Sequence, residues 1–124
     1  MRRNPILPCL FVAAVFFALT AAAGTDKPQG EKAAVEVRLS EYAVHMPQTL
    51  PAGPTTFAIR NEGQKSHSFR IEGPGIEGSS VAILRPGETA NLQVTLQPGE
   101  YKVYCPLGSH SAKGMTMKLT VNAG

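Results

Sequence analysis

The sequence is poor in cysteine and has no large excess of charge. It contains two cysteines, Cys9 and Cys105. Without Arg2 and Arg3, which belong to a basic N-terminal segment, the 12 Lys and Arg fall to 10, against 9 Asp and Glu. A chain so close to neutrality offers no basic stripe of the kind that a nucleic-acid-binding surface requires. Nucleic acid is therefore excluded as a partner.

The chain also lacks the residue groupings on which most catalysis depends. No nucleophile is placed beside a base, and no pair of carboxylates suggests acid–base chemistry. We therefore expect that the protein is not an enzyme.

Residues 1–23 are typical of a signal peptide. Arg2 and Arg3 form a positive start, residues 6–19 are largely apolar, and three alanines precede Gly24. We expect cleavage near Ala23 or Gly24, export to the periplasm and no stable insertion in the membrane. The alternative is an uncleaved membrane anchor, because the apolar run approaches the roughly 18–20 residues that span a bilayer.

Loss of this leader would remove Cys9 and leave Cys105 without an intrachain partner. A lone thiol in an oxidising compartment is a liability unless it is buried or used. Residues 24–32 contain Pro28 and Gly30 and predict a flexible tether. Residues 33–124 are long enough for one domain with one core, which we expect to be a monomer.

Alternating apolar and polar residues predict strands through most of this domain. The expected strands cover residues 35–39, 42–46, 57–59, 67–71, 81–84, 92–96, 101–105 and 115–121. Residues 73–80 are expected to form a loop, and Pro86-Gly87 and Pro98-Gly99 are typical of turns. No segment predicts a helix. Seven to eight short strands predict an all-β fold, a two-sheet antiparallel β-sandwich.

The residues from 101 to 115 carry the chemistry. Cys105 would end one strand on its apolar face, Met115 would begin the next strand, and His110 lies between them. His67 shares a face with Phe69, so it should point inward where the core opens into loops. A second imidazole could then reach the same point.

Soft sulfur ligands select copper, and imidazole suits Cu(II) as well as Cu(I). Two His and one Cys with a more distant Met are the ligands of a blue-copper electron-transfer site. We therefore predict that His67, Cys105, His110 and Met115 bind one type 1 copper ion. Met117 shares the face of Met115 and is the alternative axial ligand, although we expect it one layer deeper in the core.

Several motifs of the domain resemble the cupredoxin family, the type 1 blue copper proteins that include plastocyanin, azurin and rusticyanin. They are Asn61-Glu62-Gly63, Ser66-His67-Ser68-Phe69, Pro86-Gly87-Glu88 and the stretch from Tyr101 to Met115. The resemblance implies a Greek-key sandwich with copper near one end, beneath a loop whose histidine edge is accessible. It also implies that His67, Cys105 and His110 are ligands and that Met115 is the axial one. The spacing of His110 from Cys105 and from Met115 is similar to that of longer-loop members such as rusticyanin.

The same resemblance implies roles for residues around the metal. Ser68 takes the place of a polar side chain that bonds the cysteine loop. Tyr104 matches an exposed tyrosine that offers a second route for electrons, although a plain exposed aromatic is an equal reading. Protein redox partners would dock around the edge of His110. The docking surface would consist of Pro106, Leu107, Gly108 and Ala112.

The leading hypothesis is therefore an exported electron-transfer protein that cycles one copper between Cu(I) and Cu(II). The alternative is a copper carrier or storage protein that donates its metal. A metal-free adhesion module and a red-copper enzyme with an open coordination position are further alternatives.

His45 and Met46 would form either a second, weaker copper site or a surface histidine beside a core methionine. The sequence identifies neither the electron donor and acceptor nor the reduction potential.

Overall fold

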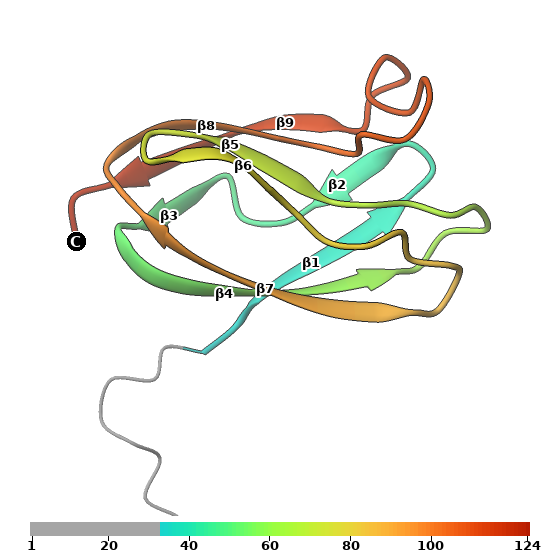
Figure 1. Ribbon diagram of the computed structural model, residues 1–124, viewed down its shortest axis with the longest axis horizontal. Coiled ribbons are helices and arrows are strands. Elements are labelled where there is room, and N and C mark those ends of the chain that lie inside the picture. The colour runs from blue at the N-terminus through green and yellow to red at the C-terminus, as the bar shows by residue number, and fades with distance from the viewer. Residues whose placement is uncertain (1–32) are drawn as a thin grey trace, which may run out of the picture.

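The chain forms nine β-strands within residues 33–124, the part of the chain that this computed structural model describes (Figure 1). One sheet has the strand order β2 (Ala43–His45), β1 (Val35–Ser40), β4 (Gly53–Asn61) and β7 (Thr89–Leu96). The other has the order β3 (Thr49–Pro51), β9 (Thr116–Asn122), β8 (Gly99–Tyr104), β5 (Arg70–Gly73) and β6 (Ile76–Ser80). The predicted signal peptide and tether, residues 1–23 and 24–32, lie outside the described residues.

The two sheets enclose one apolar core, as the period of two requires. In β8, for example, Tyr101 and Val103 are buried whereas Lys102 is exposed. The rings of Phe57 and Phe69, one from each sheet, lie 5.4 Å apart between their centroids. The expected all-β, two-sheet sandwich is therefore confirmed. The inward direction expected for His67, Cys105 and Met115 is also found, because all three are fully buried.

The expectation of an entirely antiparallel sandwich is wrong. β1 pairs with β4 in parallel, and β3 pairs with β9 in parallel. After the β1–β2 hairpin the chain crosses to the other sheet as β3 and then returns as β4 beside β1. A strand that re-enters a sheet through such a crossing takes its direction from the end at which it enters, and the local sequence does not encode that.

Two local predictions also fail. Residues 76–80, expected in a loop, form β6, which pairs with β5. Residues 81–84, expected as a strand, contribute only an isolated bridge between Leu84 and His67. Pairing with a neighbouring strand outweighs the low strand propensity of Gly78, Ser79 and Ser80. The expected turns are found, with Gly87 and Gly99 at φ values of 84° and 144°.

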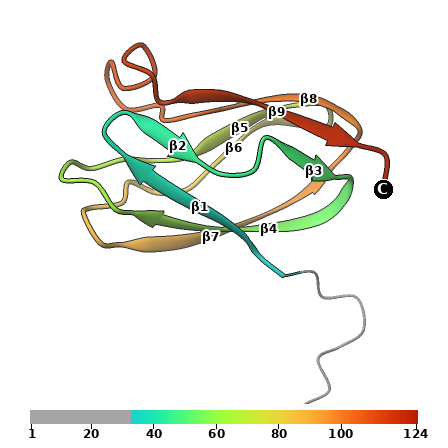
Figure 2. The ribbon, with the colours of Figure 1, turned by 180° about the vertical axis from the view of Figure 1, so that it is seen from behind.

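One end of the sandwich gathers the loops that carry the candidate ligands (Figure 2). The β8–β9 loop lies there beside the β1–β2 turn and the loop between β4 and β5, and the C-terminus lies at the opposite end (Figures 1 and 2). Within residues 33–124, no helix is long and apolar enough to cross a membrane.

Candidate metal centre

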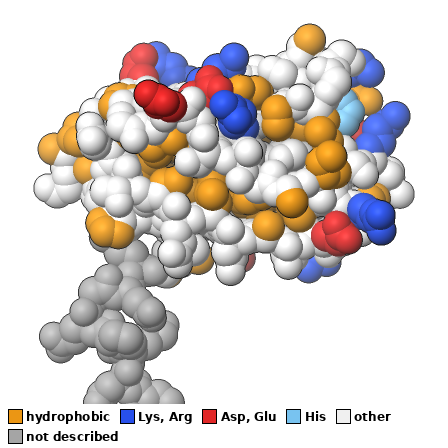
Figure 3. Space-filling model, in the orientation of Figure 1, with side chains coloured by type: hydrophobic (Ala, Val, Ile, Leu, Met, Phe, Trp, Pro, Cys, Tyr) orange, Lys and Arg blue, Asp and Glu red, His pale blue; other side chains and the backbone are white. Residues whose placement is uncertain are grey.

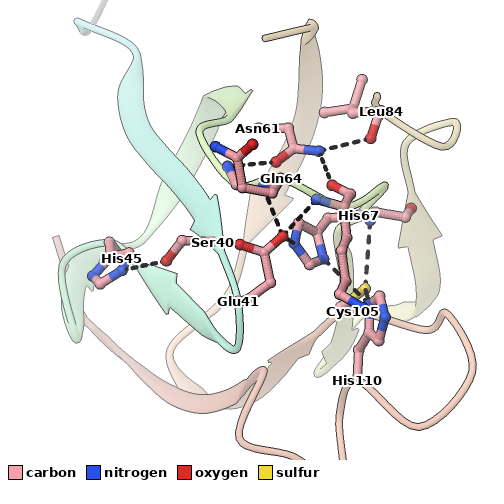
Figure 4. A network of polar contacts seen from close by, with 12 residues as sticks. Ser40, Glu41, His45, Asn61, Gln64, His67, Leu84, Cys105 and His110 are labelled. Atoms are coloured by element: carbon pink, nitrogen blue, oxygen red, sulfur yellow. Dashed lines mark hydrogen bonds and ion pairs between the residues drawn. The ribbon is translucent and has the colours of Figure 1, made fainter. Parts of the chain in front are cut away.

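Three of the four predicted ligands converge at the loop-bearing end of the sandwich (Figure 4). His67, Cys105 and His110 each offer one ligand atom, and these atoms all lie within 4.8 Å of one another. The Nδ1 atoms of the two histidines are 3.2 Å apart, and Sγ of Cys105 is 3.6 Å from Nδ1 of His110. His67 and Cys105 are buried, and His110 is half-buried. The three side chains come from two separate loops.

His67 is held by backbone bonds to the segment after β6. Its N–H donates to the carbonyl of Leu84 at 3.0 Å, and the N–H of Leu84 donates back at 2.7 Å. β5 begins only at Arg70, so His67 lies before the strand that was expected to contain it. This two-bond bridge, and not a continuous strand, fixes the backbone from which the imidazole enters the core.

Asn61 fixes the other end of the loop that carries His67. Its buried Nδ2 donates to the carbonyls of Lys65, at 2.7 Å, and Leu84, at 2.8 Å. Its Oδ1 accepts the N–H of Gly63 at 2.9 Å. A buried amide that satisfies three backbone groups turns the chain from β4 toward the metal centre.

Cys105 directly follows β8, and its N–H donates to the carbonyl of Met115 at 3.0 Å. The N–H of Ser68 points at its sulfur, with a distance of 3.4 Å. The role expected for the Ser68 side chain is wrong, because its hydroxyl donates to the carbonyl of Val81 at 2.8 Å. The backbone of Ser68, and not its side chain, contacts the cysteine.

The β8–β9 loop is a series of tight turns. The N–H of His110 donates to the carbonyl of Leu107 at 3.0 Å. The N–H of Lys113 donates to the carbonyls of both Ser109 and His110 at 3.1 Å. The N–H of Met115 donates to the carbonyl of His110 at 3.1 Å. These bonds fix the backbone of His110 between the two strands.

The two methionines of this segment differ in burial. Met115 is completely buried. Its backbone is bonded to two of the candidate ligands, because its N–H donates to the carbonyl of His110 and its carbonyl accepts the N–H of Cys105. Met117 is only partly buried and lines a surface groove together with His45 and Met46, so its expected place deeper in the core is wrong. His45 is exposed, and its Nε2 is 3.0 Å from Oγ of Ser40.

The surroundings of His110 favour its neutral form. Burial lowers its pKa, and the neighbouring His67 ring and the positive charges of Lys113 and Lys65 lower it further. The ring of Tyr42 packs edge-on against it, with 5.3 Å between the ring centroids. A neutral imidazole is the form that binds a metal, so this environment prepares His110 as a ligand.

Tyr104, beside Cys105, is tied into a charged cluster on the sheet surface. Its hydroxyl donates to Oε1 of Glu72 at 2.8 Å, and Nε of Arg70 donates to the same oxygen at 2.8 Å. Nζ of Lys102 lies 4.6 Å from the centre of the Tyr104 ring. The tyrosine is therefore half-buried and hydrogen-bonded, and not the freely exposed aromatic that the sequence suggested.

Sequence reasoning missed Glu41. It lies in the β1–β2 turn, and its Oε1 is 3.1 Å from Nε2 of His67, on the side of the imidazole away from Cys105 and His110 (Figure 4). No motif marks this position, because a glutamate after a strand is usually a solvated surface residue. Only the three-dimensional approach of the turn to His67 gives it a role.

The donor set fits one type 1 copper ion. One thiol sulfur and two imidazole nitrogens form the group, and no carboxylate oxygen belongs to it. Copper favours this combination of soft sulfur and imidazole over oxygen-rich sites. Two of the three donors, His67 and Cys105, are also buried, and a dry surrounding is one of the features by which proteins control such a metal.

Comparison with known proteins gives a consistent result. A family model described as a cupredoxin-like domain matches residues 9–121. The iron uptake system component EfeO of Yersinia pseudotuberculosis serotype I (strain IP32953) is 40% identical over 83 residues, 64% of this chain and 20% of that protein. EfeO of Escherichia coli (strain K12) is 32% identical over 110 residues, 86% of this chain and 27% of that protein. The chain thus spans about a quarter or less of these relatives.

Solved structures share the fold at low sequence identity. Reduced auracyanin from the photosynthetic bacterium Roseiflexus castenholzii superposes with a TM-score of 0.62 and 19% identity, over 75% of this chain and 99% of that chain. The Cu-containing nitrite reductase of Thermus scotoductus SA-01 gives a TM-score of 0.56 and 23% identity, over 76% of this chain and 23% of that chain.

Proposed function

The chain belongs to the family of cupredoxin-like domains, and on this premise we propose that it is an exported electron-transfer protein. His67, Cys105 and His110, with Met115 as the axial ligand, would hold one copper ion that cycles between Cu(I) and Cu(II). The observation that carries this proposal is the convergence of a buried thiol and two imidazoles, whose ligand atoms lie within 4.8 Å of one another. Donors held in place by backbone hydrogen bonds rearrange little when the charge of the ion changes, which favours rapid electron exchange.

The surface around His110 supports a docking site for protein redox partners. Pro106, Gly108 and Ala112 are exposed, and Leu107 is partly buried. These small and apolar side chains leave the edge of His110 close to the surface, where a partner could approach the metal centre. An electron would then leave through the imidazole, without exposing the sulfur of Cys105.

The charges near this surface indicate what kind of partner would bind. Figure 3 shows Lys and Arg side chains at the end of the molecule where the β8–β9 loop lies. Lys113 and Lys65 are close enough to His110 to lower its pKa. We therefore propose that the partner presents an acidic surface, because complementary charge accelerates encounter.

The compartment and the absence of catalysis are parts of the same proposal. The leader-like residues 1–23 support export to the periplasm, where the domain would act as a monomer. A site filled by four side chains leaves no coordination position for a substrate, which supports an electron carrier over an enzyme. The nitrite reductase that shares the fold is a much longer chain, of which this domain matches 23%.

A second candidate function is metal handling, and the likeness to EfeO favours it. That relative is named as a component of an iron uptake system. In this case the domain would carry or store copper and donate it to another protein, in support of metal uptake. The buried Cys105 argues against it, because a carrier needs ligands that a recipient protein can reach.

One experiment separates the two functions. The copper-loaded protein is reduced and reoxidised through several cycles, and then exposed to a competing Cu(I) chelator for the same total time. An electron carrier keeps its copper and regains its full visible spectrum after each cycle. Transfer of the copper to the chelator within the time of one cycle, without reversible reduction, would support the carrier instead.

A further inference from the structure

The outward nitrogen of His67 has a carboxylate as its partner. Nε2 of His67 lies 3.1 Å from Oε1 of Glu41, while Nδ1 of the same ring faces His110. The imidazole is completely buried, and the Glu41 side chain is 23% exposed. A ring held through one nitrogen by a carboxylate presents its other nitrogen to a metal in a fixed orientation.

The same carboxylate oxygen accepts two further hydrogen bonds. The N–H of Lys65 donates to it at 2.6 Å and the N–H of Gln64 at 2.8 Å. An oxygen that accepts three donors belongs to an ionised carboxylate, which has only acceptor sites. Glu41 therefore carries its negative charge.

The chain leaves space for this carboxylate at Gly63. A Cβ on this buried glycine would lie 2.6 Å from Oε1 and 2.7 Å from Oε2 of Glu41, well inside contact distance. The loop that leads to His67 thus provides both the donors that hold the carboxylate and the space that it occupies. Two backbone N–H groups of this loop and the space at Gly63 therefore all act on the side chain of Glu41.

We propose that Glu41 is a positioning residue of the metal centre, which fixes His67 and adds a negative charge behind it. This inference rests on the proposed copper site. Because the carboxylate accepts from Nε2, the proton of His67 stays on that nitrogen and Nδ1 is free to bind. The added charge stabilises Cu(II) more than Cu(I), since the ion of higher charge gains more from a nearby anion. Glu41 therefore lowers the reduction potential.

Glu41→Gln is the sharpest test, because it removes the charge and retains an oxygen that can accept the same bonds. We expect the Cu(II) affinity to fall by about tenfold or more and the Cu(I) affinity to fall less, so that the reduction potential rises. Glu62→Gln is the matched control. It makes the same change of charge at an exposed residue of the neighbouring loop, paired with Arg38 and not with His67. Equal potentials in Glu41→Gln and wild type would overturn the proposal.

Gly63→Ala tests the same contact without changing the charge of the protein. The added methyl group should displace the carboxylate of Glu41 from His67, and the Cu(II) affinity should fall as in Glu41→Gln. The double variant should lose little more than either single variant, because both act on one interaction. Additive losses in the double variant would show that Gly63 acts through something other than Glu41.

A third measurement needs no copper and separates this inference from the proposed function. Nitrogen NMR of the metal-free protein should show His67 protonated on Nε2 in wild type, and a mixture of tautomers in Glu41→Ala. Failure of the wild type to bind copper, with this tautomer present, would refute the copper site and retain Glu41 as the anchor of His67. A tautomer unaffected by Glu41→Ala would refute the anchoring itself.

Discussion

Asn61 and Leu84 are joined by a hydrogen bond of 2.8 Å, from the buried Nδ2 to a carbonyl oxygen that also accepts the N–H of His67. The bond connects two segments that lie 23 residues apart in the sequence. It thereby ties the end of β4 to the segment that holds His67 from the other side. The position of this candidate ligand depends on a side chain that never approaches the metal.

Asn61→Ala should destabilise the protein and loosen the site together. The substitution leaves the carbonyl of Lys65 and the N–H of Gly63 without this partner and removes one of the two hydrogen bonds to the carbonyl of Leu84. An unsatisfied buried group costs about 1–3 kcal/mol of unfolding free energy. Urea denaturation of the metal-free protein measures this loss. Asn91→Ala, at an exposed position of β7, is the control and should change stability by less than about 0.5 kcal/mol. Equal effects of the two variants would contradict the role given to Asn61.

Met115→Ala and Met117→Ala should have different effects. Removal of the fully buried Met115 side chain costs about 2–5 kcal/mol, and the partly buried Met117 should cost less. As the proposed axial ligand, Met115 should also determine the visible spectrum and the reduction potential of the copper-loaded protein, whereas Met117→Ala should leave both unchanged. Absorption spectroscopy and voltammetry of the two variants decide this. A spectrum altered by Met117→Ala alone would show that the axial assignment is wrong.

The contact between Tyr104 and Glu72 should make stability depend on pH at both extremes. Hydrogen bonds from Arg70 and then Tyr104 lower the pKa of Glu72 despite some burial, and the hydrogen bond to Glu72 raises the pKa of Tyr104. The contribution of Glu72 to the stability of the fold is present above its unfolded pKa, near 4.5, and is lost as pH falls through its folded pKa. The contribution of Tyr104 to stability is present below its unfolded pKa, near 10.0, and is lost as pH rises through its folded pKa.

Tyr104→Phe tests this pH dependence directly. The variant should be slightly less stable than wild type at neutral pH, and the difference in midpoint of thermal unfolding should begin to shrink as pH rises above 10. Its rate of electron exchange at the His110 surface should be unchanged. A constant difference in stability from pH 6 to pH 11 would mean that the hydrogen bond to Glu72 contributes nothing.

Lys113→Glu should slow electron exchange with anionic reagents. Nζ of Lys113 lies 4.8 Å from the centre of the Tyr42 ring, which packs on His110, so the variant places a negative charge beside the proposed docking surface. Stopped-flow oxidation of the reduced protein by hexacyanoferrate(III) should slow by about threefold or more at low salt, and less at high salt. Lys118→Glu, on β9 and paired with Glu100, is the control. Equal slowing by both variants would place the encounter elsewhere on the molecule.

The sequence predicts the side chains of the site better than it predicts the strands that carry them. Parity along 101–105 and 115–121 correctly places Cys105 and Met115 on the inner face, because the period of two is local and backbone-determined. The convergence of His67 with Cys105 and His110 follows from motif and parity together. None of this requires knowledge of how the strands pair.

Long-range pairing is where the prediction fails. The parallel partners of β1 and β3 depend on where the chain crosses between sheets, and β6 forms because β5 offers it an edge, not because its own residues favour strands. Glu41 was missed for a related reason. It lies 26 residues from His67, and only the approach of the β1–β2 turn to the β4–β5 loop brings the two together.

The most direct measurement is the visible spectrum of the purified protein with one equivalent of Cu(II), recorded before and after reduction, beside Cys105→Ser treated in the same way. The account predicts an intense thiolate-to-copper absorption in the wild type that disappears on reduction and returns on reoxidation, and none in the variant. A wild type without this absorption, or a variant that retains it, would contradict the copper site built on Cys105.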